Sequence, residues 1–350
     1  MSLIKHFFLI SECQFNHFLI ENLPDLVIKV GNNRIHLIFP SLIPSNKNEY
    51  MTLKLTKGLF FILLSFSLSF QLVAQRDFSK VEIKTEKLSD NIYVLFGSGG
   101  NIGICVGEDG VIMIDDQYAP LSEKIEAAID EISEHPVKYL LNTHWHGDHT
   151  GGNEHFGSKG ATIIAHDNVR ARLSKEQTMK AFNRTVPAAP KPAWPIITFS
   201  EKISLYANGE DLMAIHVHNA HTDGDSFIYF PKSNVLHMGD TYFNGRFPFI
   251  DLSSGGTVDG IIKAVNQALF IVDENTKIIP GHGAVSNKKE LMAYRDTILG
   301  VRTKVKKAVD KGLSIEEIKT AGFLEGLDEW GSGFINGERF LDILYADFSR

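Results

Sequence analysis

The sequence is short of cysteine, of positive charge and of long apolar runs. Two cysteines in 350 residues, Cys13 and Cys105, exclude a scaffold held together by disulfides. Acidic residues outnumber Lys and Arg by 42 to 35, so the chain lacks the basic surface of a general nucleic-acid binder. With 43% hydrophobic and 22% charged residues, the composition is that of a globular protein and excludes a disordered or fibrous chain.

The longest apolar run, residues 59–70, is shorter than the about 20 residues that a membrane-spanning helix needs. Lys54 and Lys57 precede it and Leu72-Val73-Ala74 follow it, which is the arrangement of a secretory signal peptide. An uncleaved membrane anchor is the alternative. We therefore expect a signal peptide over residues 51–75, a periplasmic or secreted protein, and no stable membrane insertion after cleavage.

Met51 stands where the start methionine of such a signal would stand, which leaves residues 1–50 without a role. They show no clear period and no motif, and we interpret them as an over-extended reading frame or a disordered extension. A genuine N-terminal extension is the alternative. Without residues 1–75 the chain keeps 29 basic and 38 acidic residues, a net charge of −9. Cys105 then has no intramolecular partner and is predicted to be a small buried apolar residue.

Two series of short strands, each followed by helices, make up most of the remaining chain. The first has predicted strands at 92–96, 102–106, 111–114, 137–141 and 162–165 and helices at 120–132 and 168–173. The second has predicted strands at 203–206, 212–217, 226–230, 235–238 and 277–279 and helices at 260–271 and 287–311. The repetition predicts one α/β domain over residues 76–312, folded as a four-layer αββα sandwich. A C-terminal tail, 313–350, is expected to pack a helix at 338–348 on this domain.

Residues 175–198 carry four prolines and interrupt the pattern between the two series. Such a segment is either an active-site lid or a surface connection.

The chemistry of the chain is concentrated in four short motifs that follow predicted strands. The first is His144-Trp145-His146-Gly147-Asp148-His149, and the others centre on His221, Asp240 and His282. Solvated or core histidines are the alternative, but clustered imidazoles repel one another on protonation unless a metal or a charged partner holds them. Alternate residues of a loop can direct His144 and His146 at one cation, with Asp148 and His149 directed at a second beside it.

In these motifs, taken in this order, the chain resembles the metallo-β-lactamase superfamily over about residues 81–285. The resemblance implies the αββα fold and a dinuclear site, usually zinc. It implies that one metal takes His144, His146 and His221. It implies that the other metal takes Asp148, His149 and His282, and that Asp240 bridges the two. Asp148 and Asp240 are the implied catalytic residues, with Asp148 orienting the attacking hydroxide.

Neutral imidazoles and carboxylates suit Zn²⁺, although iron or manganese fit the same ligands. Two such metals share a bridging hydroxide that attacks a carbonyl carbon. The function expected is that of an exported zinc hydrolase acting on a small molecule, a lactone, an ester or a β-lactam. Established zinc β-lactamases carry Cys or Ser where this chain has Asp240, which favours lactones and esters. A β-lactamase proper, and a metal-binding or sulfur-relay protein without turnover, are the alternatives.

The remaining histidines and several aromatic residues are interpreted as structural, or are left open between a structural and a binding role. His216, His218 and His237 are read as packing or supporting groups, and His135, His155 and His166 as surface residues. Six aromatic residues either line an apolar substrate pocket or pack in the core: Trp145, Trp194, Tyr242, Phe243, Phe247 and Phe249. No oligomeric state follows from the sequence.

Overall fold

The computed structural model describes residues 25–30, 33–38 and 77–350, which fall into two units, one within residues 1–76 and one over residues 77–350. In the first unit, β1 (Asp25–Val30) pairs antiparallel with β2 (Asn33–Ile38). Residues 1–50, expected to be a disordered or spurious extension, therefore contain at least this hairpin. The predicted signal peptide, residues 51–75, lies outside the described residues.

A seven-stranded sheet forms the first half of the second unit, in the order β11-β8-β7-β6-β5-β4-β3. Its strands are β3 (Lys84–Lys87), β4 (Ile92–Phe96), β5 (Ile102–Cys105), β6 (Val111–Ile114), β7 (Val137–Leu141), β8 (Thr162–His166) and β11 (Ile197–Phe199). Strands β3 to β6 pair antiparallel, whereas β6, β7, β8 and β11 pair parallel. The parallel strands bring their carboxyl ends to one edge of the sheet.

The second half is a five-stranded sheet in sequence order. Its strands are β12 (Lys202–Ala207), β13 (Glu210–His216), β14 (Ser226–Phe230), β15 (Val235–His237) and β16 (Lys277–Ile279). The first four pair antiparallel and β16 pairs parallel with β15, after the helix α7 (Val258–Ile271) has crossed over between them. The carboxyl ends of β15 and β16 therefore also share one edge.

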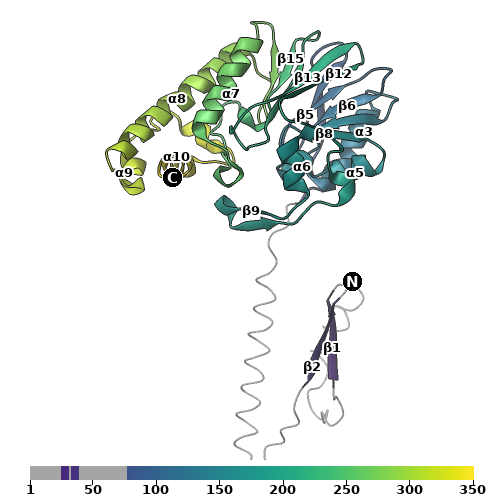
Figure 1. Ribbon diagram of the computed structural model, residues 1–350, viewed down its shortest axis with the longest axis horizontal. Coiled ribbons are helices and arrows are strands. Elements are labelled where there is room, and N and C mark those ends of the chain that lie inside the picture. Colours follow the sequence, from purple (N-terminus) through teal and green to yellow (C-terminus); the bar gives the residue numbers. More distant parts are fainter. Residues whose placement is uncertain (1–24, 31–32, 39–76) are drawn as a thin grey trace, which may run out of the picture. The chain divides into compact units, whose positions relative to one another are not determined.

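Three apolar layers hold this unit together, and they confirm the predicted αββα sandwich. Side chains such as Ile112 and Ile228 pack between the two sheets, where Cys105 is buried as predicted. On the outer face of the first sheet lie α3 (Ser122–Asp130), α5 (Asn153–Ser158) and α6 (Asp167–Leu173). On the outer face of the second sheet lie α7 and α8 (Lys288–Asp310), on the opposite side of the molecule in Figure 1.

The long helix α8 begins and ends where the sequence predicts. The Asn287 side chain accepts a hydrogen bond from the Glu290 backbone N–H, which satisfies one of the free donors of the first turn. After the helix, Gly312 has a φ of +80°, a left-handed conformation that costs glycine little. The helix is thus bounded by one capping side chain and one glycine.

The proline-bearing segment over residues 175–198 contains regular secondary structure. It contains a hairpin of β9 (Gln177–Met179) and β10 (Arg184–Val186), with the single turn η2 (Lys180–Phe182) between them. It then adds β11 to the edge of the first sheet, parallel to β8. Strands of three residues are too short for their alternation to be recognised in sequence.

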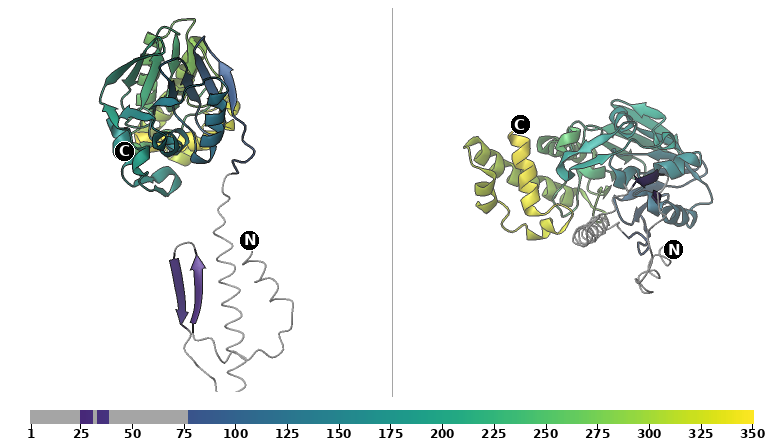
Figure 2. Two further views of the ribbon diagram at one scale, coloured as in Figure 1. Left: turned by 90° about the vertical axis from the view of Figure 1, so that its right-hand side faces the viewer. Right: turned by 90° about the horizontal axis from the view of Figure 1, so that it is seen from below.

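The C-terminal residues continue the outer helical layer. α9 (Ile315–Thr320) begins with a capping box between Ser314 and Glu317, and α10 (Gly337–Phe348) packs on both α8 and α9. Figure 2 (right) shows the yellow C-terminal helix beside the yellow-green helices. Phe340 of α10 is fully buried and stacks on Phe247 with 4.7 Å between ring centroids. Across the described residues, no helix combines the length and hydropathy needed to cross a membrane.

We expect Phe340→Ala to lower the free energy of unfolding by about 3–5 kcal/mol, because it leaves a cavity in a packed core. Urea denaturation of wild type and variant measures the difference. Phe270→Ala is the matched control, since the Phe270 side chain on α7 is 93% exposed, and its effect should stay within about 0.5 kcal/mol. Equal effects of the two substitutions would show that α10 does not contribute to the core.

Candidate metal centre

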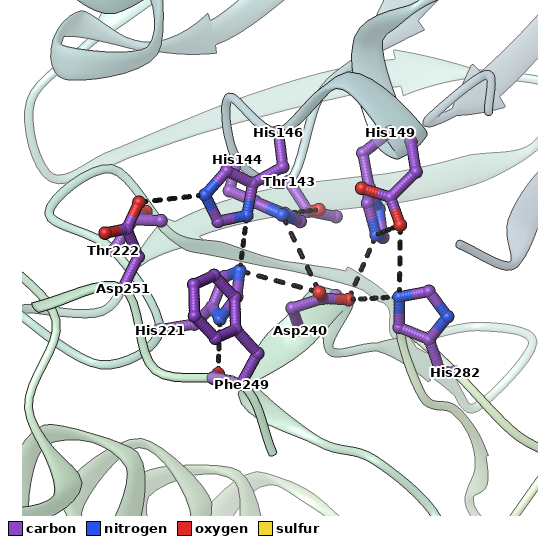
Figure 3. A network of polar contacts seen from close by, with 12 residues as sticks. Thr143, His144, His146, His149, His221, Thr222, Asp240, Phe249, Asp251 and His282 are labelled. Carbon is purple, nitrogen blue, oxygen red and sulfur yellow. Dashed lines mark hydrogen bonds and ion pairs between the residues drawn. The ribbon is translucent and has the colours of Figure 1, made fainter. Parts of the chain in front are cut away.

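The loops that follow four strands bring the seven predicted ligand residues together (Figure 3). His144 and His146 follow β7, and Asp148 and His149 lie on the first turn of the short helix α4 (Gly147–Thr150) rather than in a loop. The remaining three come from the second sheet. His221 lies between β13 and β14, Asp240 lies in the 3₁₀ turn η4 (Gly239–Thr241) after β15, and His282 follows β16.

The potential ligand atoms form two groups, and within each group they lie within 4.8 Å of one another. The first group is His144, His146, His221 and Asp240. The second group is Asp148, His149 and His282. This is the partition that the resemblance implies, and it places two sites able to hold metal ions side by side.

The Asp240 carboxylate lies between the two groups, one oxygen toward each (Figure 3). Its Oδ2 is 3.8 Å from His144 Nε2 and 3.5 Å from His221 Nε2. Its Oδ1 is 3.0 Å from His149 Nε2 and 3.3 Å from His282 Nε2. A carboxylate in this position has the geometry of a bridge between two cations.

Two imidazoles are fixed by buried carboxylates on the side away from the centre. His146 Nε2 is 3.1 Å from Asp251 Oδ2, and His149 Nδ1 is 2.7 Å from Asp115 Oδ2. Each carboxylate accepts a hydrogen bond from the ring N–H, which fixes the ring with its opposite nitrogen toward the centre. Carboxylates behind metal-ligating histidines orient the ring and raise its basicity in this way.

The other two buried imidazoles are fixed by neutral acceptors. His221 Nδ1 donates to the Phe249 carbonyl oxygen at 2.7 Å, and His144 Nδ1 lies 3.0 Å from the Thr143 hydroxyl. That hydroxyl donates to Asp115, so it is free to accept from His144. The nitrogens facing the centre are acceptors. As a result, His221 Nε2 and His146 Nδ1 face each other at 2.8 Å, an arrangement that needs a shared proton or a cation.

Buried atoms without a hydrogen-bond partner test whether metal ions fit here. Among the described residues, His144 Nε2 is buried without a hydrogen-bond partner, and His149 Nε2 and Asp240 Oδ1, also buried, have only ion-pair contacts within the cluster. An unpaired buried polar group costs about 1–3 kcal/mol, so these inward-facing atoms favour a bound cation. Five imidazoles and two carboxylates are a donor set that suits Zn²⁺. The residues therefore fit two metal ions.

Burial and neighbouring charges shift the pKa values of the histidines in opposite directions. Burial lowers the pKa of His221 to about 4 and that of His144 well below its usual range, so both rings are neutral ligands at pH 7. Burial alone would also lower the pKa of His282, but the carboxylates of Asp240 and Asp148 raise it to about 9. Without metal this ring is therefore protonated at neutral pH, and metal binding must displace its proton.

Two glycines allow neighbouring loops to approach the Asp240 carboxylate and the His149 imidazole closely. A Cβ atom at Gly281 would lie 2.0 Å from Asp240 Oδ1, and one at Gly100 would lie 2.0 Å from a ring carbon of His149. Asn101 then fixes the loop that carries His282, because its side-chain amide donates to the carbonyl oxygens of Pro280 and Gly283.

Sequence reasoning missed the two carboxylates that support the rings. Asp115 directly follows the buried strand β6, and the pair Asp115-Asp116 at the end of an apolar run was a signal that could have been followed. Asp251 follows a run of aromatic and apolar residues and has no motif around it. Its role depends on a loop that returns to His146 from 105 residues away.

The remaining histidines divide as follows. His237 is structural, as predicted: it is buried and lies 3.0 Å from the Asn101 carbonyl oxygen. His216 is also a packing group, as predicted. His166 is not a surface residue, because it is buried and its ring stacks on that of His216 with 3.8 Å between centroids. His135 is exposed, as predicted. His218 is exposed too, so it is not the packing group that the sequence predicted.

The aromatic residues nominated for a substrate pocket are mostly core residues. Tyr242 and Phe247 pack in the main apolar cluster under α7 and α8. Phe243 stacks on His282 at 5.1 Å, and Phe249 lies 5.8 Å from the ring of His146. Only these last two and Trp145, 4.8 Å from His146, contact the ligand residues.

Comparison with known proteins agrees with this geometry. Residues 95–283, more than half of the chain, match the metallo-beta-lactamase superfamily. The chain belongs to this superfamily of hydrolases.

The chain is also similar to several curated proteins. It is 30% identical over 144 residues to the 2,4-dinitroanisole O-demethylase subunit alpha of Nocardioides sp., covering 40% of each chain. It is 29% identical to the metallo-beta-lactamase type 2 of Elizabethkingia meningoseptica, over 45% of this chain and 61% of that one. It is 28% identical to a hydroxyacylglutathione hydrolase of Nitrosococcus oceani, over 43% and 50%. The chain thus spans about 40–61% of the length of these relatives.

Solved structures show the same fold at low sequence identity. A metallo-beta-lactamase from Pontibacter korlensis superposes with a TM-score of 0.52 at 17% identity, over 62% of this chain and 99% of that one. The sec-alkylsulfatase Pisa1 from Pseudomonas sp. superposes with a TM-score of 0.56 at 16% identity, over 75% and 50%. These similarities confirm the αββα fold.

We expect Asp251→Asn to weaken metal retention by the group of His144, His146 and His221 by about 10- to 100-fold, because the ring of His146 loses its charged partner. Competition with a chromogenic chelator measures the affinity. Asp259→Asn is the control, since Asp259 is exposed and pairs with Arg302. Equal affinities in wild type and Asp251→Asn would show that Asp251 does not support the site.

Proposed function

We propose that this chain is an exported dinuclear zinc hydrolase that cleaves lactones or activated esters in preference to β-lactams. The position of Asp240 supports this most strongly. A hard carboxylate with one oxygen toward each histidine group would hold two cations close together, and such a pair would activate water for attack on a carbonyl.

Zinc bound by the two groups would supply a nucleophile from water near neutral pH and an electrophile for a carbonyl oxygen. His144, His149 and His221 are fully covered and act only as ligands. The side chains of Asp148 and His282 are each 22% exposed and form the edge of the site that solvent reaches. The substrate therefore enters beside these two residues.

Asp148 is the proposed catalytic residue at this edge. Burial alone would raise the pKa of its carboxyl, but His149 and His282 hold that pKa below its usual range, so the carboxylate is ionised. Its Oδ2 lies 3.4 Å from His282 Nε2. An ionised carboxylate at the open edge can accept a hydrogen bond from the attacking water and so orient it.

The substrate preference rests on chemistry, because the relatives carry different names. They are named as an O-demethylase, a metallo-beta-lactamase and a hydroxyacylglutathione hydrolase, and each is matched over only part of its length. Alkoxide leaving groups of esters and lactones need little help beyond a cation. The departing nitrogen of a β-lactam needs protonation as well. A site with Asp at position 240, and not the Cys or Ser of established zinc β-lactamases, fits the first kind of substrate better.

Turnover of a panel of lactones and 4-nitrophenyl esters, set against penicillins and carbapenems, tests the proposal. We expect the zinc-loaded protein to show a higher kcat/KM on at least one lactone or ester than on any β-lactam. Elemental analysis of the same sample should give two zinc ions per chain. Asp240→Asn should lose retention of one metal together with turnover, since it removes a negative charge from between two dications. Efficient β-lactam hydrolysis with no ester or lactone activity would reverse the ranking.

Export is proposed from residues 51–75, which lie outside the described residues. A basic segment, a short apolar run and a small residue form a signal that is cleaved during secretion. We expect the protein recovered from the periplasm or the medium to begin near Gln75. Amino-terminal sequencing measures this, and material recovered only from the cytoplasm with an intact residue 51–75 segment would contradict export.

A further inference from the structure

Three phenylalanines from separate parts of the chain meet beside one half of the metal centre. Phe249 lies 5.8 Å from the ring of His146 and 5.7 Å from that of His221. Phe182, in the turn of the β9–β10 hairpin, lies 5.0 Å from Phe249 and 5.5 Å from Phe334. Phe334 precedes α10 and is 64% exposed. Phe249 itself is buried, so the aromatic contacts run from the candidate ligand histidines through Phe249 to a surface formed by Phe182 and Phe334.

Arg339 of α10 lies over the outer part of this surface. Its guanidinium carbon is 4.6 Å from the centre of the Phe182 ring and 5.7 Å from that of Phe334. One of its N–H groups donates to the Ala181 carbonyl oxygen at 3.2 Å. Within the described part of the chain, Arg339 forms no ion pair with a carboxylate. Its remaining donors are thus held beside the rings, with no carboxylate of the described residues within ion-pair distance.

The contrast with Arg302 shows that this arrangement is not a general feature of arginines here. Arg302 also lies over a phenylalanine, 5.3 Å from the centre of the Phe348 ring. Its guanidinium is paired with both oxygens of Asp259, at 2.8 and 3.0 Å. An arginine stacked on a ring but left without a carboxylate is suited to bind one from outside.

We propose that Phe182, Phe334 and Arg339 recognise the substrate, which is an ester or lactone with an apolar arm that ends in an anionic group. The arm lies on the two outer rings, Phe182 and Phe334, and the anion pairs with Arg339. The scissile carbonyl reaches the metal centre at its open edge, beside Asp148 and His282. This rests on the proposed hydrolase function. It assigns substrate recognition to Phe334 and Arg339, which lie outside the region matched to the superfamily.

The physical basis is an apolar surface that ends in a fixed positive charge. An apolar arm gains free energy by covering exposed aromatic area, and each ring adds to that gain. The chain as a whole is acidic, with a formal net charge of −7, so it repels anions elsewhere. Discrimination therefore comes from Arg339, and a charge-assisted hydrogen bond of about 1.5–3 kcal/mol gives at least about tenfold in affinity.

The first measurement needs no turnover. 1-Anilinonaphthalene-8-sulfonate, an aromatic anion, is titrated into zinc-loaded protein and its fluorescence gives a Kd. We expect Phe334→Ala and Arg339→Gln each to raise this Kd about tenfold. Phe270→Ala and Arg302→Gln are the matched controls, the first an exposed phenylalanine and the second an arginine that is already paired. A Kd that neither site variant changes, or that the controls raise equally, overturns the proposal.

The second measurement compares two esters of equal length, 4-nitrophenyl octanoate and the mono-4-nitrophenyl ester of suberic acid, which adds a terminal carboxylate. Wild type should prefer the suberyl ester, and Arg339→Gln should lower the ratio of the two kcat/KM values about tenfold. An unchanged ratio with both esters hydrolysed overturns the inference and leaves the hydrolase function standing. Loss of dye binding in the site variants, with no ester hydrolysed by any protein, supports the surface and rejects the ester substrate.

Discussion

Five imidazoles and two carboxylates converge at one place, and each of these buried polar groups needs a hydrogen-bond partner or a cation. This requirement governs much of the structure. In four of the five rings the nitrogen that faces away from the centre has an acceptor, a carboxylate for His146 and His149 and a neutral oxygen for His144 and His221. Those partners fix the rings, so the inward nitrogens have no freedom to turn away from one another. The loops around them must then approach closely, which is why residues without a Cβ stand at Gly100 and Gly281.

The aspartates near the centre do different work because their surroundings differ. Asp115 and Asp251 lie behind the rings and accept hydrogen bonds from them, whereas Asp240 and Asp148 face inward. A fifth, Asp225, holds the loop of His221 by accepting hydrogen bonds from the backbone there, and burial raises its pKa to about 8. The same side-chain type thus supports ligands, supplies ligands and anchors a loop, according to burial and neighbouring charge.

The ligand residues were predictable because they stand in compact motifs directly after apolar strands. The sandwich was predictable because strand and helix periods alternate clearly on both sides of the excursion. Asp251 was not, since its importance arises only when a loop folds back on His146. The contact between Phe182, Phe334 and Arg339 was equally hidden, because it joins a short hairpin to the C-terminal residues and has no local pattern. Sequence periodicity reports which face of an element is buried, but not which distant loop meets it.

The ligand histidines are divided between the two sheets, His144, His146 and His149 after the first and His221 and His282 after the second. A cation bound by both sets joins the halves of the sandwich as a crosslink would, although a reversible one. The folded state binds it and the unfolded chain does not bind it in the same way, so free metal concentration enters the folding equilibrium directly. Scarcity of the metal would then reduce the amount of intact protein, and the abundance of this chain would follow the metal supply of its surroundings.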